Sequence, residues 1–209
     1  MIVNNFNILA RHFDTLKCSE DFFFVQILQR TKDGHEKAHV IRSYYFYNVD
    51  HFLSKQDSII ELCHKYNARA YFWVNPRNAK RISAECIKEF TNLLVNDNCV
   101  GGYTVWDRMC GSYSSPNGVK LWIVDIDTKD EKVIETIKNL VNESRGALDN
   151  KIAYIIPTVQ GVHLLTRGFD IHQFNQLCII NHVPVPDVHK NNLTLLYYAK
   201  NYHSMGERQ

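Results

Sequence analysis

The chain has 209 residues, which is the usual length of one domain, or of one domain with a small additional module. Hydrophobic residues make up 45% of it and charged residues 22%, a composition that excludes disordered, collagen-like and small disulfide-stabilised classes. Twenty-four Lys and Arg against 22 Asp and Glu give a formal charge of +2, so any nucleic-acid partner must be bound by a local basic surface.

The six cysteines form no C-x-x-C pair, so neither a zinc ribbon nor a thioredoxin-type site is predicted, and we expect reduced, mostly buried thiols. The first residues lack a basic segment followed by a long apolar one. No stretch reaches the roughly 18–20 apolar residues that a membrane span requires. We therefore expect a cytoplasmic protein without a membrane partner.

The first half of the chain has the pattern β-β-α-β-α. Residues 22–30 and 38–47 are rich in aromatic and β-branched residues and flank the turn pair Asp33-Gly34, which predicts an antiparallel hairpin. Residues 68–77 form a short aromatic strand that Asn75-Pro76 interrupts. Apolar residues at helical spacing predict one amphipathic helix on each side of this strand: Phe52, Leu53, Ile59, Ile60, Cys63 and Tyr66 before it, and Ser83, Cys86, Ile87, Phe90, Leu93 and Leu94 after it.

A long connection rich in Gly and Ser, residues 97–118, separates this half from the next. We place the boundary there, with an N-terminal α/β module at 1–100, a connecting loop at 101–118 and a second module at 119–209. Gly101-Gly102 and Arg108 in this segment could cover a bound nucleotide, although a plain surface loop has the same features.

The second module has the order β-α-β-β-α-β. Strands are predicted at 119–127, 151–158, 161–167 and 193–199, with a helix after the first strand and a shorter one that Asp170 could cap. This is the split βαβ order of ferredoxin-like and RNA-recognition-type folds, which have an antiparallel sheet with helices on one face. The predicted class is α+β, with an RNA-recognition-like module packed against the N-terminal module.

Two carboxylates end the apolar strand of this module. Asp125 and Asp127 are two residues apart, so their side chains project from one face of the strand. Such a pair suits Mg²⁺ or Mn²⁺, whose coordination shell is completed by substrate phosphates in nucleotidyl-transfer sites. The alternative is a solvated strand end.

Three further residues could complete a site. His163 lies in a strand two residues after Gly161, where a glycine lets a ligand or another backbone approach; the alternative is a hydrogen-bonded core histidine. Asp187 follows Pro186 and could be a third carboxylate or a turn residue. Asp170 competes for the third position unless it caps a helix.

An apolar strand ending in D-x-D, then G-x-H, then a third Asp resembles the archaeo-eukaryotic primase (primase-polymerase) superfamily, of the small phage and mobile-element type. The strand YFWVNPR is similar to the segment that precedes the catalytic strand in many of these proteins. The resemblance implies metal binding by Asp125, Asp127 and Asp187, and a contact from His163 to the triphosphate of the incoming nucleotide. It also implies that Arg77 contacts nucleotide or template; the alternative is a solvated strand end.

The resemblance implies a metal-dependent nucleotidyltransferase of DNA replication that synthesises DNA or RNA on a single-stranded template. Its partners would be nucleoside triphosphates and single-stranded nucleic acid, with unwinding by a separate helicase. Basic residues on the hairpin, Arg30, Lys32, Lys37 and Arg42, could bind phosphates together with Lys80 and Arg81. Two alternatives remain: a catalytically silent nucleotide- or nucleic-acid-binding protein on the same scaffold, and a metal-dependent nuclease.

Overall fold

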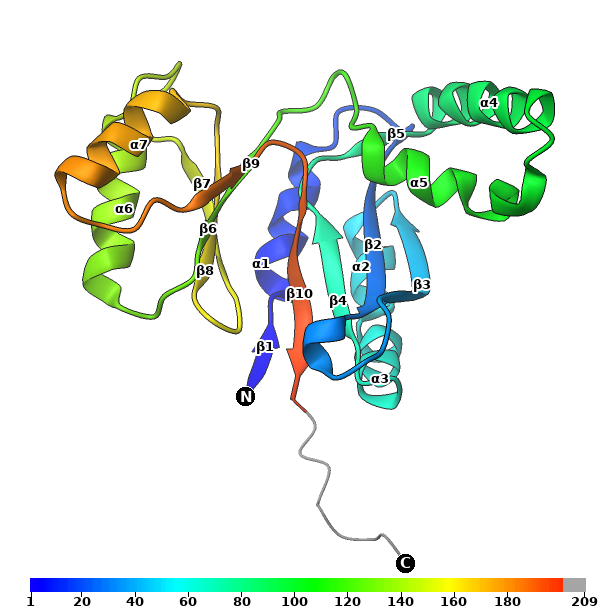
Figure 1. Ribbon diagram of the computed structural model, residues 1–209, viewed down its shortest axis with the longest axis horizontal. Helices are drawn as coiled ribbons and strands as arrows, with labels where there is room; N and C mark the ends of the chain where they lie inside the picture. The colour runs from blue at the N-terminus through cyan, green and yellow to red at the C-terminus, as the bar shows by residue number, and fades with distance from the viewer. Residues whose placement is uncertain (201–209) are drawn as a thin grey trace, which may run out of the picture.

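The computed structural model describes residues 1–200 and shows an α+β protein with two antiparallel sheets (Figure 1). The first sheet contains six strands, of which β5 pairs only with β2. In spatial order, the others are β1 (Ile2–Asn4), β10 (Leu193–Ala199), β4 (Arg69–Trp73), β2 (Asp21–Gln29) and β3 (His39–Phe46), and β5 is Arg77–Asn78. The predicted hairpin is confirmed, since β2 and β3 pair in antiparallel register.

Helices cover one face of this sheet. Phe23, Val25 and Phe72 alternate with residues of the opposite face and point into the main core, because successive side chains of a strand point to opposite sides. They meet Phe6, Phe52 and other apolar residues of the covering helices. These helices are α1 (Phe6–Ala10), the 3₁₀ turn η1 (Arg11–Thr15), α2 (Val49–Ser54) and α3 (Gln56–Lys65).

The second sheet has four strands and carries two helices on one face (Figure 1). Its spatial order is β7 (Ile152–Pro157), β8 (Val162–Thr166), β6 (Trp122–Ile126) and β9 (Asp187–His189). Val124 and Ile126 pack beneath the helices, whose apolar stripes include Ile137 and Phe174. The helices are α6 (Glu131–Glu143) and α7 (Ile171–Ile180).

The strand Leu193–Ala199 lies in the first sheet, which corrects its predicted place in the second. We expected it to end the second sheet, but it pairs with β1 and β4 in the first, and Asp187–His189 takes the expected place beside β6. Five consecutive residues of β10 are buried, so both of its faces need cover, and the interior of the first sheet provides it. The chain therefore crosses back to the first sheet after building the second.

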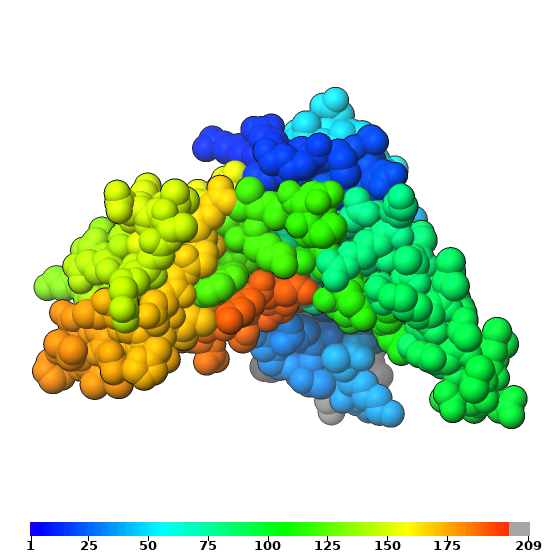
Figure 2. Space-filling model, turned by 90° about the horizontal axis from the view of Figure 1, so that it is seen from above, coloured from blue at the N-terminus to red at the C-terminus, as the bar shows by residue number. Residues whose placement is uncertain are grey.

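The segment expected to be a connecting loop contains helix α5 (Val105–Ser112), preceded by the 3₁₀ turn η3 (Cys99–Thr104). With α4 (Ala79–Val95), α5 forms an arm that stands out from the sheets in Figures 1 and 2. Val105 and Cys110 are fully buried against Phe22 and Phe24 on the second face of the first sheet. The helix has only eight residues and lies among glycines, so its apolar pattern is too short to predict it.

The thiols agree with the sequence expectation, since all six cysteines are free and four of them, Cys63, Cys86, Cys110 and Cys178, are buried. Burial raises the pKa of Cys63 and Cys110 to about 12. Within residues 1–200, no helix combines the length and apolarity needed to cross a bilayer.

Candidate functional site

Strand pairing brings three of the predicted site residues into one row. Asp125 on β6 lies directly opposite His163 on β8 and directly opposite Asp187 on β9. Directly opposed residues project from the same face of a sheet. Residues that are 38 and 62 positions from Asp125 in the sequence are therefore its immediate neighbours in space.

The alternation along β6 decides which way this row faces. Trp122, Val124 and Ile126 pack on the helix side of the second sheet, so Ile123 and Asp125 face the first sheet. Asp127 follows directly after the strand and lines the same cavity as Asp125. The prediction that the two carboxylates share one face is confirmed.

A cavity of about 530 Å³ lies between the two sheets. One wall is lined by Asp125, His163 and His189 of the second sheet and by Asp127, directly after β6. The other is lined by Arg30 and Lys32 of the β2–β3 turn and by Arg69 and Tyr71 of β4. Figure 2 shows β10 (orange-red) between the lobe of the second sheet and the β2–β3 turn (blue). We call this space the carboxylate cavity. Acidic and basic groups thus face each other across it.

Asp187 opens onto a smaller neighbouring cavity of about 220 Å³, which Asp125 and Asp127 also line. Its side chain is exposed, whereas Asp125 is half-buried. Asp187 is therefore next to the pair in the sheet, but it does not line the larger cavity.

His163 connects Asp125 to the first sheet. Its Nε2 lies 3.1 Å from Asp125 Oδ1, and its Nδ1 lies 2.8 Å from the hydroxyl oxygen of Thr194 on β10. When the ring is neutral and Nε2 donates to the carboxylate, Nδ1 accepts from the Thr194 hydroxyl. The close contact with His163 lowers the pKa of Asp125, against the opposing effect of burial. Asp125 is consequently ionised at neutral pH.

Gly161 allows the segment around Asp127 to lie close against the backbone before β8. A Cβ atom at this position would overlap the carbonyl oxygen of Ile126 and would lie 2.6 Å from the carbonyl oxygen of Thr128. No side chain fits there, because the opposing atoms belong to the backbone. The expectation that Gly161 allows a close approach of another backbone is confirmed, and the backbone is the one that carries Asp127.

The basic wall comes from the β2–β3 turn and from β4. Arg69 Nε donates to Asp33 Oδ2 at 2.6 Å, and the Arg69 guanidinium stacks over the Tyr198 ring at 4.2 Å. Arg30 donates to the Tyr71 hydroxyl at 3.1 Å. Burial lowers the pKa of Lys32, as do its neighbours Arg69 and Arg30, while the charges of Asp33 and then Asp127 raise it.

Arg69 is the residue of this wall that sequence reasoning missed. It stands between Ala68 and Ala70 at the start of a buried strand, and only 9% of its side chain is exposed. A charged residue between small residues in an otherwise apolar strand was the available signal. Arg30 and Lys32 were among the expected phosphate-binding residues, and both line the cavity.

The structure does not bring Arg77 and Arg108 to the cavity, which corrects their expected roles. Arg77 is fully buried: its Nη1 donates to the Asn75 carbonyl at 2.6 Å, its Nε to the Cys110 carbonyl, and its guanidinium lies 4.9 Å from the Trp73 ring. Arg108 pairs with Glu89 of α4 at 2.9 Å. Both arginines hold the arm together and do not face a ligand site.

Replacing Arg77 with alanine is expected to lower the free energy of unfolding by roughly 2–4 kcal/mol, because two buried carbonyls would lose their donor. Urea denaturation measures this change. The matched control is Arg108→Ala, which removes a partly exposed ion pair and is expected to cost at most about 1 kcal/mol. Equal stability of the two variants would contradict the packing role of Arg77.

Asp170 lines neither of the two cavities that Asp125 and Asp127 line. It is the N-cap of α7, where its Oδ1 accepts from the Gln173 backbone N–H at 3.0 Å, and its other oxygen pairs with Arg145 at 3.2 Å. The backbone hydrogen bond lowers its pKa. The expected capping role is confirmed, which leaves Asp187 as the third acidic residue near the pair.

The acidic pair suits a divalent cation that arrives with a phosphate ligand. Within residues 1–200, no group of three or more His, Cys, Asp or Glu side chains is arranged to hold a metal ion by itself. Asp125 and Asp127, however, present hard oxygen donors to one cavity. Mg²⁺ is commonly bound through one or two carboxylates, with water and substrate phosphates as the other ligands. The donor set therefore fits Mg²⁺ or Mn²⁺ in a shared coordination shell.

The geometry above is the basis for assigning a function, because comparison with known proteins does not supply one. No protein-family model matches the chain, and neither a curated protein nor a solved structure matches it. The residues to be explained are the acidic pair, the histidine beside it and the basic wall opposite.

Proposed function

We propose that the chain is a metal-dependent nucleotidyltransferase of the primase-polymerase type, which adds nucleotides on a single-stranded DNA or RNA template. The observation that carries this proposal is the row formed by Asp125, His163 and Asp187 on three adjacent strands, with Asp127 beside it. Across the cavity from these residues stands a basic wall. A nucleotide polyphosphate with a bound divalent cation has the complementary chemistry.

The topology of the second sheet supports the same proposal. The elements follow each other as β6-α6-β7-β8-α7-β9, and the spatial order is β7-β8-β6-β9 with both helices on one face. We propose that it is the split βαβ arrangement of ferredoxin-like and RNA-recognition-type folds. The strand β6 lies between β8 and β9, so a carboxylate at its end has neighbours on both sides.

Each residue of the cavity has a task in this chemistry. A bound divalent cation would neutralise the charge that develops on the reacting phosphate. Asp125 and Asp127 would hold it, with Asp187 at the edge of the site. His163 keeps the Asp125 carboxylate oriented through its 3.1 Å contact. Arg30 and Lys32 face the carboxylates across the cavity. They would bind phosphate oxygens through charge-assisted hydrogen bonds.

The test is incorporation of labelled nucleotides on a primed single-stranded template, with Mg²⁺ or Mn²⁺ and with EDTA as control. We expect primers to be lengthened only when the metal is present. Metal-dependent shortening of the template would show the nuclease instead. Binding of template with neither reaction would show a catalytically silent scaffold.

A further inference from the structure

Helix α4 has more apolar surface than the molecule covers. One stripe of it, Ile82, Cys86 and Leu93, packs in the cluster that joins the arm to the first sheet. The adjacent stripe was part of the same predicted amphipathic face, but it is exposed: Ile87 at 67%, Phe90 at 45% and Leu94 at 67%. Nothing in the part of the chain that the structure describes covers this second stripe.

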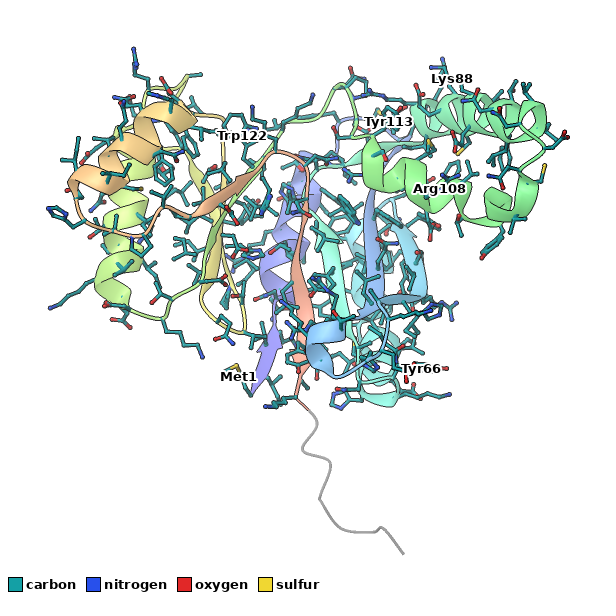
Figure 3. The ribbon with its side chains drawn as sticks, viewed as in Figure 1. Met1, Tyr66, Lys88, Arg108, Tyr113 and Trp122 are labelled. Carbon is teal, nitrogen blue, oxygen red and sulfur yellow. The ribbon has the colours of Figure 1, made fainter. Side chains whose placement is uncertain are left out.

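The turn after α4 extends the exposed stripe. Val95 ends the helix at 77% exposed, and η3 has Val100 at 85% and Tyr103 at 90%. The turn lies against the stripe, since a Cβ atom at Gly102 would be 3.6 Å from the Phe90 ring. Figure 3 shows this arm, marked by Lys88 and Arg108, standing out from the sheets on the side away from Trp122. We call the six exposed side chains the arm patch: Ile87, Phe90, Leu94, Val95, Val100 and Tyr103.

The arm patch has the size of a protein interface. A fully exposed residue of this kind has about 150–200 Å² of surface, so the six leave roughly 700 Å² exposed. The largest apolar patch of a typical monomer is about 300–600 Å². A stable interface covers about 800 Å² on each partner. The arm patch therefore supplies most of one side of such an interface.

The charges around the arm patch are balanced. Two cations pair within the arm, Lys88 with Glu85 and Arg108 with Glu89, each at 2.9 Å. A membrane surface or a nucleic acid would require an excess of basic residues here. A second copy of the same surface requires no excess, because a rim of one sign would repel itself. Residues 79–112 have four cationic and four anionic side chains: Lys80, Arg81, Lys88 and Arg108 against Glu85, Glu89, Asp97 and Asp107.

We infer that the arm patch is the interface of a homodimer, in which α4 of one copy packs antiparallel against α4 of the other. Ser83, Ile87, Phe90 and Leu94 are spaced by four, three and four residues, which is the alternation that lets the side chains of two helices interlock. Antiparallel packing places the positive end of each helix dipole beside the negative end of the other. A two-fold axis at the middle of the stripe then sets Ile87 of each copy opposite Leu94 of the other.

The dimer would leave the carboxylate cavity open, since no side chain of the arm patch lines that cavity. The inference therefore goes beyond the proposed function and does not depend on it.

Analytical ultracentrifugation of the full chain over a range of concentrations measures the dissociation constant of the dimer. The test variants are Ile87→Glu and Leu94→Lys, and the matched control is Ile180→Lys, whose side chain is 69% exposed on α7. We expect the wild type to dimerise and each test variant to raise the dissociation constant at least about tenfold, because a charge would be buried against an apolar side chain. Ile180→Lys should keep the wild-type value. Circular dichroism would verify that all three variants are folded.

A mixture of the two test variants examines the antiparallel contact itself. In a mixed dimer, the glutamate introduced in one copy would face the lysine introduced in the other, and the second contact would be the unchanged pair of Leu94 and Ile87. We therefore expect the mixture to associate at least about tenfold more tightly than either variant alone.

Three results would overturn the inference. A wild type that stays a single copy at the highest concentration would exclude the dimer, and binding of that single copy to neutral lipid vesicles would assign the patch to a membrane instead. Equal weakening by Ile180→Lys would show association through other surfaces. A mixture that associates no better than its components would exclude the antiparallel pairing of Ile87 with Leu94.

Discussion

Gly161→Ala is expected to lower the free energy of unfolding by roughly 2–4 kcal/mol and to reduce nucleotide incorporation well beyond what the stability loss explains. The new Cβ would overlap the carbonyl oxygen of Ile126 and would lie 2.6 Å and 2.7 Å from the carbonyl oxygen and the amide nitrogen of Thr128. All three atoms belong to the backbone, so no side-chain rotation relieves the overlap. The segment that carries Asp127 must move away from β8.

Urea denaturation and the rate of incorporation at saturating nucleotide measure the two effects separately. The matched control is Gly101→Ala, because no atom lies within 4 Å of a Cβ built at Gly101. This control is expected to change stability by no more than about 0.5 kcal/mol and to leave incorporation unchanged. A Gly161→Ala protein as stable and active as the control would show that the segment around Asp127 adapts freely.

The acidic pair illustrates what sequence periodicity can predict. The spacing of Asp125 and Asp127 places both on one face, and the flanking apolar residues form a buried strand, as the pattern WIVDI indicates. The capping role of Asp170 was also predictable, because a helix N-terminus requires an acceptor for its free N–H groups. These predictions depend on local geometry only.

The basic wall shows where sequence reasoning fails. Arg69 and Lys32 reach the cavity from the first sheet, and their approach to Asp125 depends on how the two sheets pack. The strand Leu193–Ala199 was assigned to the wrong sheet for the same reason: its apolar pattern predicts a strand but does not identify its partners. Which distant strands pair depends on how all apolar residues of the core pack together.

Arg77 illustrates a different failure. A cationic residue at the end of a strand, after Asn-Pro, is typical of an exposed position that could contact a ligand. The structure instead buries it between the Trp73 ring and the carbonyls of Asn75 and Cys110, where burial lowers its pKa to about 10. Its carbonyl partner at Cys110 lies on α5, a helix that the sequence did not predict. The packing role of Arg77 therefore could not be predicted either.

The basic wall and the acidic row are each fixed in place by a contact to a neighbouring element. Asp33 engages Arg69, which keeps the β2–β3 turn, and with it Lys32 in the lining of the carboxylate cavity, against β4. His163 links Asp125 to Thr194, which ties the second sheet to β10. The distance between acidic and basic groups is therefore set by the rigid packing of two sheets. Such preorganisation is what electrostatic stabilisation of a phosphate reaction requires.

Asp125→Asn is expected to reduce metal-dependent incorporation by about 100-fold or more, since stabilisation of the transition-state charge by a metal amounts to several kcal/mol. Asparagine keeps the size of the side chain and still accepts from His163 through its amide oxygen, but it removes the negative charge that a divalent cation needs. The side chain of Asp125 is 31% exposed, so the change in unfolding free energy should stay within about 1 kcal/mol.

The matched control for Asp125→Asn is Asp170→Asn, which alters the other candidate carboxylate while keeping an oxygen for the helix cap. It is expected to retain incorporation at the wild-type level. Isothermal titration with Mn²⁺ in the presence of a nucleotide gives a second readout: after subtraction of the heat of Mn²⁺ binding to the nucleotide alone, the remaining heat should be lost in Asp125→Asn and kept in Asp170→Asn. If Asp125→Asn incorporated nucleotides as fast as Asp170→Asn, the row on β6, β8 and β9 would not be the reaction centre, because its central charge would be dispensable.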